Sequence, residues 1–158
     1  MRVPAMQSLR RTVGGLTLLE LLLGLAVAGV LAVIGNAVYT GAIEKARVGR
    51  AVGDIVEFDA VIERYRTKHG TLPSDIAQFN PSGRLDPWGN PYHYTLLEGT
   101  KGKGDARKDR RLNPLNADYD IFNAGRNDVF KTQISQKDSL DDVIRARTGG
   151  FVGLAEDF

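Results

Sequence analysis

The hydrophobic residues of this chain are concentrated near its beginning. From Leu16 to Tyr39 the sequence is almost continuously apolar, and Glu20 is the only charged residue in the stretch. As a helix, residues 16–39 extend about 36 Å, which is enough to cross the roughly 30 Å hydrocarbon core of a bilayer. A helix also satisfies its own backbone hydrogen bonds, as lipid requires. The pattern therefore predicts one membrane-spanning helix.

The helical pattern continues through residues 40–69, where polar residues cover one side. This stretch contains no proline, and its apolar residues recur at helical spacing, at Val48, Val52, Ile55, Phe58, Ile62 and Tyr65. Such a stripe is typical of an amphipathic helix with one face packed on a core. Gly70 is placed to end the helix, and Pro73 prevents its continuation.

A helix over residues 16–69 would be about 81 Å long. The roughly 90 residues that follow it cannot form a core that covers such a length. Its apolar N-terminal half must then be covered by lipid or by copies of itself. We therefore predict a filament subunit, with a simple membrane-anchored domain as the alternative.

Turn formers and short apolar runs alternate through the rest of the chain. Residues 86–91 are dense in turn formers, and we expect strands at residues 92–97 and 118–123. The other expected elements are a short helix at 74–79 with Ser74 as its cap, a turn at 125–128, and short pieces at 129–134, 143–146 and 151–158. Together these elements predict an α+β fold, with a long N-terminal helix packed on a small antiparallel sheet.

Composition excludes several kinds of chemistry. The 158 residues include no cysteine and two histidines, so disulfides, thiolate metal sites and cysteine nucleophiles are excluded. His69 and His93 have no nucleophile near them in the sequence, and no nucleotide-binding motif occurs. We expect no enzymatic activity.

The net charge of +2 owes much to the first fifteen residues, which hold three arginines and no acid. Without them, 18 basic residues face 19 acidic residues, so the charge does not indicate nucleic-acid binding. A basic run at residues 101–111 lacks interleaved aromatic residues, and we expect it to be a solvated loop.

The residues around the start of the apolar stretch carry a resemblance to a known family. Gly14-Gly15-Leu16-Thr17-Leu18-Leu19-Glu20 resembles the cleavage site of type IV prepilins and type II secretion pseudopilins. The resemblance implies that residues 1–15 are a leader and that a prepilin peptidase cleaves after Gly15. Leu16 would then become the N-methylated first residue, where phenylalanine is usual in the family.

The resemblance also gives Glu20 a role. Cleavage creates a cationic amino group at the membrane, and the Glu20 carboxylate is a partner for that group on a neighbouring subunit. Such pairing would neutralise two charges that are costly in lipid and would set the axial register of the helices. The alternative is that Glu20 only marks the interfacial end of the helix. Arg10 and Arg11 favour a cytoplasmic N-terminus, which places the domain after Tyr39 in the periplasm.

A second fragment narrows the resemblance. Residues 86–92, DPWGNPY, are similar to a signature of the major (G-type) pseudopilin of type II secretion, and Tyr65, Gly70 and Pro73 match the end of its helix. The implied protein is a pilin-like structural subunit of a pseudopilus that drives protein export across the outer membrane. Its partners would be further copies, other pseudopilins, the prepilin peptidase, an inner-membrane assembly platform and membrane lipid. A type IV pilin for adhesion, motility or DNA uptake is the alternative.

The resemblance divides the chain into four parts. They are a leader (1–15), a transmembrane and assembly helix (16–39), an amphipathic helix half (40–69) and a periplasmic C-terminal domain (70–158). The last part is rich in oxygen-bearing side chains, which calcium prefers. Its segments 120–128 and 141–143 are similar to the calcium-binding segments of major pseudopilins, with a longer connecting loop. The implied ligands are Asn123, Asn127, Asp128, Asp141 and Asp142, and the alternative is a solvated acidic loop.

Overall fold

The computed structural model describes residues 15–100 and 104–158. The expected leader, apart from Gly15, lies outside these residues, as do Lys101 and Lys103 of the basic run. The chain divides into two compact units, Met1–Gly41 and Ala42–Phe158. The C-terminal unit therefore includes part of the long helix together with everything that follows it.

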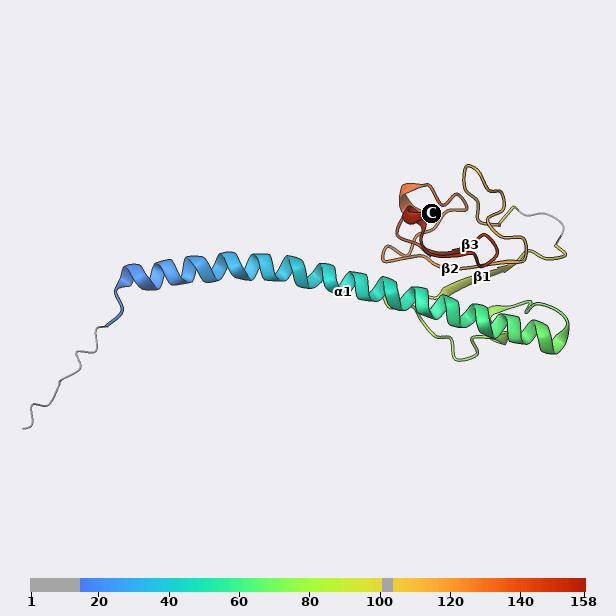
Figure 1. Cartoon of the computed structure of the whole chain (residues 1–158), viewed down its shortest axis with the longest axis horizontal. Coiled ribbons are helices and arrows are strands. Elements are labelled where there is room, and N and C mark those ends of the chain that lie inside the picture. Colours follow the sequence, from blue (N-terminus) through green and yellow to red (C-terminus); the bar gives the residue numbers. More distant parts are fainter. Residues whose placement is uncertain (1–14, 101–103) are drawn as a thin grey trace, which may run out of the picture. The chain divides into compact units, whose positions relative to one another are not determined.

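The first element is the long helix α1, Leu18–His69, which contains 52 residues (Figure 1). Every described residue from Gly15 to Ala42 is exposed. By length and composition α1 could cross a membrane. The apolar stretch of 18 residues on which this rests is not buried anywhere in the structure. This half of the helix thus has no core of its own within the described chain.

The second half of α1 buries the apolar stripe that its sequence predicts. Ile55, Phe58 and Ile62 are fully buried, and Val48 and Val52 pack partly against the same core. The helix ends at the expected place, because the residue after His69 is a glycine with φ of +74°, whose N–H donates to Arg66 O.

Four short strands form one antiparallel sheet in the order β1-β2-β3-β4 (Figure 1). They are β1 (Tyr92–Leu96), β2 (Tyr119–Asn123), β3 (Val143–Ala146) and β4 (Phe151–Leu154). The expected α+β, pilin-like architecture is therefore confirmed. The expected strands 92–97 and 118–123 each end or begin within one residue of the observed strands.

The two faces of the sheet carry separate cores. Tyr119 and Ile121 of β2 point to the face that packs on α1, whereas Phe122 belongs to a second cluster on the opposite face. The alternation follows from the pleat of a strand, which sends successive side chains to opposite sides. The second cluster also includes Leu115, Ile134, Ile144, Ala146 and Ala155. Because both faces are covered, all five residues of β2 are buried.

Two of the smaller expectations are wrong. The short helix after α1 is a single 3-10 turn, Ile76–Gln78, and its cap is Asp75, whose Oδ1 accepts from Ala77 N at 2.7 Å. Ser74 is one position too early for this role. No regular strand forms at 129–134, which is a loop with one isolated bridge between Gln133 and Lys108.

The DPWGNPY segment forms a tight turn directly before β1, and this turn contacts α1. Asp86 Oδ1 accepts hydrogen bonds from the backbone N–H groups of Trp88 and Asn90, at 2.9 and 2.8 Å. The indole Nε1–H of Trp88 donates to Glu44 Oε1 at 3.0 Å, and the ring packs against the core. Aspartate here holds the turn, while tryptophan connects it to the helix.

A buried arginine fastens the helix face of the sheet. Arg145 of β3 is 3% exposed, and its guanidinium donates to both carboxylate oxygens of Asp118 at 2.9 Å. It also donates to Asp59 of α1 and lies over the ring of Tyr119, 4.0 Å from the centroid. The charge is thus paired, as a buried guanidinium requires.

Candidate functional site

The first turn of α1 is closed by hydrogen bonds between Thr17 and Glu20. Glu20 Oε2 accepts from both the backbone N–H and the hydroxyl of Thr17, each at 2.8 Å. In return, the Glu20 N–H donates to Thr17 Oγ1 at 3.2 Å. This reciprocal pattern is a capping box, which satisfies backbone donors that a helix start leaves free. A threonine three positions before a glutamate is the sequence signature of such a cap. The hydrophobic pattern that predicts the membrane helix does not include this signature.

Next to this cap, α1 presents a long apolar surface. Leu18 and Leu19 are 76% and 75% exposed, and Val33 is 72% exposed. The other large apolar side chains exposed on this segment are Leu16, Leu21, Leu22, Leu23, Leu25, Val27, Val30, Leu31, Ile34 and Val38. An apolar surface this extensive marks contact with a membrane or with other proteins.

The structure joins two of the five expected calcium ligands directly, Asn127 and Asp141. Asp141 Oδ2 accepts from the backbone N–H groups of Arg126 and Asn127, and its Oδ1 accepts from Asn127 Nδ2 at 2.7 Å. The Oδ1 of Asn123 accepts from Val143 N at 3.0 Å. The side chains therefore fasten the turn after β2 to the segment before β3.

A glycine makes this close packing feasible. Gly125 has φ of +62°, and a Cβ atom there would lie 2.4 Å from the carbonyl oxygen of Asp141. The backbone conformation and the approach of Asp141 both exclude a side chain. Asp128, the fifth expected ligand, is exposed and has φ of +55°.

Asp142 is bound to a cation that the chain itself supplies. Its Oδ2 accepts from Arg107 Nη2 at 2.5 Å, and the two side chains are 0% and 3% exposed. The guanidinium lies over the ring of Phe122, 4.2 Å from the centroid. The expectation of a wholly solvated loop at 101–111 is thus wrong for Arg107, because this part of the loop folds onto the sheet.

Burial dominates the electrostatics of the Arg107–Asp142 pair. It raises the pKa of Asp142 to about 6 and lowers the pKa of Arg107, while their mutual attraction opposes both shifts. Asp120 lies close by and accepts from the backbone N–H of Arg107 at 2.7 Å, and burial raises its pKa as well. Two buried carboxylates, those of Asp120 and Asp142, therefore lie close to Arg107.

The oxygen atoms of these side chains are not arranged to coordinate a calcium ion. Calcium takes six to eight oxygen ligands. The Asp141 and Asn123 oxygens already accept N–H groups, and Asn127 Oδ1 accepts from Val129 N at 2.7 Å. Asp142 Oδ1 has no hydrogen-bond partner but belongs to a carboxylate already paired with Arg107. Within residues 15–100 and 104–158, no three acidic or histidine side chains converge on one point.

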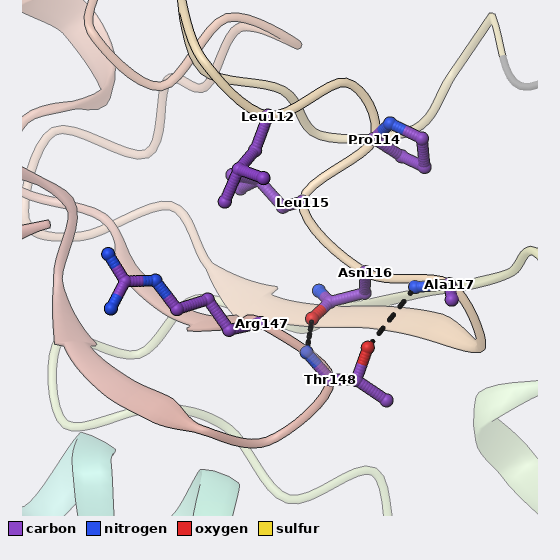
Figure 2. A pocket seen from close by; sticks show the side chains of 7 residues that line it. All are labelled: Leu112, Pro114, Leu115, Asn116, Ala117, Arg147 and Thr148. Carbon is purple, nitrogen blue, oxygen red and sulfur yellow. Dashed lines mark hydrogen bonds between the residues drawn. The ribbon is translucent and has the colours of Figure 1, made fainter.

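A shallow cavity of about 370 Å³ lies beside the loop before β2. Figure 2 shows its lining, in which Asn116 Oδ1 accepts from Thr148 N at 2.8 Å and Thr148 Oγ1 accepts from Ala117 N. Leu112 and Leu115 supply apolar wall. These polar groups hold two loops together. The lining contains no carboxylate, histidine or lysine that could act as a base for the Thr148 hydroxyl.

Comparison with known proteins gives an informative match. Over 117 residues the chain is 31% identical to the type II secretion system core protein G of Pseudomonas aeruginosa strain PAO1. The aligned part is 61% of this chain and 82% of that protein. No family model matches the chain, and no solved structure matches it.

Proposed function

The chain belongs to the family of the type II secretion system core protein G, and from this membership we propose that it is a structural subunit of a secretion pseudopilus. The observation that carries the proposal is the apolar surface of residues 16–38, which includes the first half of α1 and whose large apolar side chains are exposed. Nothing within residues 15–100 and 104–158 covers this surface, whereas a bilayer or a bundle of identical helices would bury it.

The proposed work of the protein is mechanical. Residues 16–39 anchor the precursor in the inner membrane, with a cytoplasmic N-terminus and a periplasmic C-terminal domain. The subunits then leave the membrane and pack into a short filament with copies of themselves and with other pseudopilins. An assembly platform in the inner membrane, driven by a partner ATPase, adds subunits, and the growing filament moves folded cargo across the outer membrane.

Processing precedes assembly in this proposal. A prepilin peptidase removes the leader after Gly15, and the new N-terminal residue, Leu16, is N-methylated. Gly15 and Leu16 precede α1, which begins at Leu18, and both are exposed. An extended, accessible segment before a helix is a suitable protease substrate.

Glu20 is proposed to pair with the amino group of a neighbouring subunit. Its carboxylate has two oxygens, and only Oε2 is engaged in the capping box with Thr17. Cap and intersubunit pair are therefore compatible in one side chain. Substitutions can separate the two roles, because glutamine retains the capping acceptor but not the charge.

Cysteine cross-linking tests polymerisation directly, since the chain has no cysteine of its own. A double variant, Leu23→Cys with Val30→Cys at two exposed positions, would be oxidised in cells that contain the secretion machinery, so that each subunit can form a disulfide with a neighbour on either side. Because adjacent helices lie side by side in a filament, subunits that carry both cysteines should give a ladder of multimers. A non-polymerising, membrane-anchored domain would give monomers and dimers only.

The same assay tests Glu20. We expect Glu20→Gln to reduce the yield of the ladder at least about tenfold, the equivalent of a lost contact of about 1.4 kcal/mol. Thr17→Ala is the matched control, because it breaks the cap and leaves the charge. If Glu20→Gln forms the full ladder, the intersubunit pair is not needed and Glu20 only caps the helix.

Complementation distinguishes the secretion pseudopilus from a type IV pilus. The gene would be expressed in a strain that lacks its own G-type pseudopilin but retains the rest of the secretion machinery. Restored export of a secreted enzyme supports the proposal. Restoration of twitching or DNA uptake in a pilin-deficient strain, without restored export, would favour the pilus.

A further inference from the structure

Two loops far apart in the sequence are joined on the sheet face that lies opposite α1. Lys108 N donates to Thr132 O at 2.8 Å, and Ile134 N donates to Lys108 O at 3.0 Å. Leu115 N also donates to Arg107 O at 2.8 Å. These backbone bonds fix Arg107 from both sides, so its side chain enters the sheet face in a defined direction.

The guanidinium of Arg107 is held by charge and by aromatic rings. It pairs with Asp142 Oδ2 and lies over Phe122, and its central carbon is 5.7 Å from the ring centroid of Phe130. Both charged side chains are almost wholly buried. Removing either one would leave the other charged in an apolar setting, which is among the most costly changes in a protein core.

The neighbouring oxygens are occupied by neutral donors. Asp141 is bound by two backbone N–H groups and the Asn127 amide, while Asp120 is bound by Asn116 Nδ2 and the backbone N–H of Arg107. The turn after β2 is therefore fastened to the segment before β3 by the protein's own donors. The one fixed positive charge that reaches these carboxylates from the opposite loop is that of Arg107, among the residues described.

We propose that Arg107 acts as a built-in cation for this region. Its guanidinium neutralises Asp142 and orders residues 123–142, so the folded domain does not depend on calcium. A covalently attached cation is present at every ion concentration, and the Nη2 of Arg107 already makes a charge-assisted hydrogen bond to Asp142 Oδ2.

Thermal unfolding of the full chain in detergent micelles tests the proposal. The melting temperature of the unmodified protein should be the same in millimolar calcium and in excess chelator, since a ligand that binds the folded state must stabilise it. Direct titration with calcium, followed by calorimetry, should show no binding heat. This part needs no variant and so does not depend on whether a variant folds.

Variants test the cation itself. Arg107→Met keeps the apolar stem and removes the charge, and we expect it to lower the melting temperature by about 10 °C or more. Arg110→Met, at an exposed position of the same loop, is the matched control and should change it by less than about 2 °C. Arg107→Met combined with Asp142→Asn should recover part of the loss, because neither charge is then left unpaired.

Two results would overturn the proposal. One is a rise of about 5 °C or more when calcium is added to the unmodified protein, which would indicate a genuine calcium site. The other is an Arg107→Met variant whose melting temperature in excess chelator equals that of the unmodified protein. Neither result bears on assembly, so the proposed pseudopilus function stands or fails separately through the cross-linking assay.

Discussion

The hydroxyl of Tyr92 donates a hydrogen bond to Oδ2 of Asp54 at 2.8 Å, joining the first strand of the sheet to the buried side of α1. The other oxygen of Asp54 accepts from Arg84, which also pairs with Glu57. A carboxylate on the core face of a helix is thus satisfied from the strand and from the loop before it. This network sets how the amphipathic half of α1 rests on the sheet.

Tyr92→Phe should weaken this junction. Burial and the hydrogen bond to Asp54 raise the pKa of Tyr92, so the hydroxyl keeps its proton and remains a donor. Its loss leaves one oxygen of a nearly buried carboxylate without a partner, at a cost of about 1–2 kcal/mol. We expect a melting temperature about 4–8 °C lower, measured by circular dichroism. Tyr65→Phe, on a half-exposed part of α1, is the control and should have little effect.

Gly125→Ala should destabilise the C-terminal domain strongly. The new Cβ would lie 2.4 Å from Asp141 O, at a residue whose φ is +62°. Gly99→Ala is a matched control, because Gly99 has φ of +74° and a Cβ added there would meet no atom within 4 Å. The control measures the cost of the backbone conformation alone, about 1–2 kcal/mol. If both variants melt at the same temperature, the close approach of Asp141 is not important.

Sequence patterns predict the helices and strands of this fold but not its electrostatic contacts. The stripe through Ile55, Phe58 and Ile62 predicted the buried face of α1, and Gly70 predicted its end, because both depend on local geometry. Arg107 lies in a run of charged residues, a pattern typical of solvated loops. Its burial depends on pairing with Asp142, 35 positions later, which no local pattern encodes.

The candidate site divides in the same way. The resemblance indicates Asn127 and Asp141, whose side chains are hydrogen-bonded to each other, and Asn123, whose Oδ1 accepts from the backbone N–H of Val143. What it could not supply is that their oxygens accept N–H groups from the protein. The T-x-x-E pattern of Thr17 and Glu20 is the signature of the capping box that the structure shows, whereas the assembly role of Glu20 follows only from the family resemblance.

His93 should make the stability of the domain dependent on pH. Its ring stacks on Phe122, and burial lowers the pKa of His93, which Asp128 opposes and Arg107 reinforces. The unfolded chain therefore binds a proton more readily than the folded one, and stability is lost as the pH falls below the unfolded value of about 6.5. The stability is fully present above that value.

Melting temperatures at pH 7.5 and pH 5.5, values chosen to lie about one unit on either side of 6.5, measure this effect. We expect a larger decrease for the unmodified protein than for His93→Phe, which retains the stacking and cannot be protonated. His69→Gln serves as the control, since His69 is exposed at the end of α1. Equal decreases in the unmodified protein and in His93→Phe would show that other groups cause the pH dependence.

The proposed function depends most on the apolar half of α1 being kept in the mature protein while the leader is removed. Mass spectrometry of the protein purified from membranes of cells with an active prepilin peptidase measures this directly. We expect an N-terminal peptide that begins at Leu16 and carries one added methyl group. A protein that still begins at Met1, or one that has lost the residues up to Tyr39, would contradict the proposal.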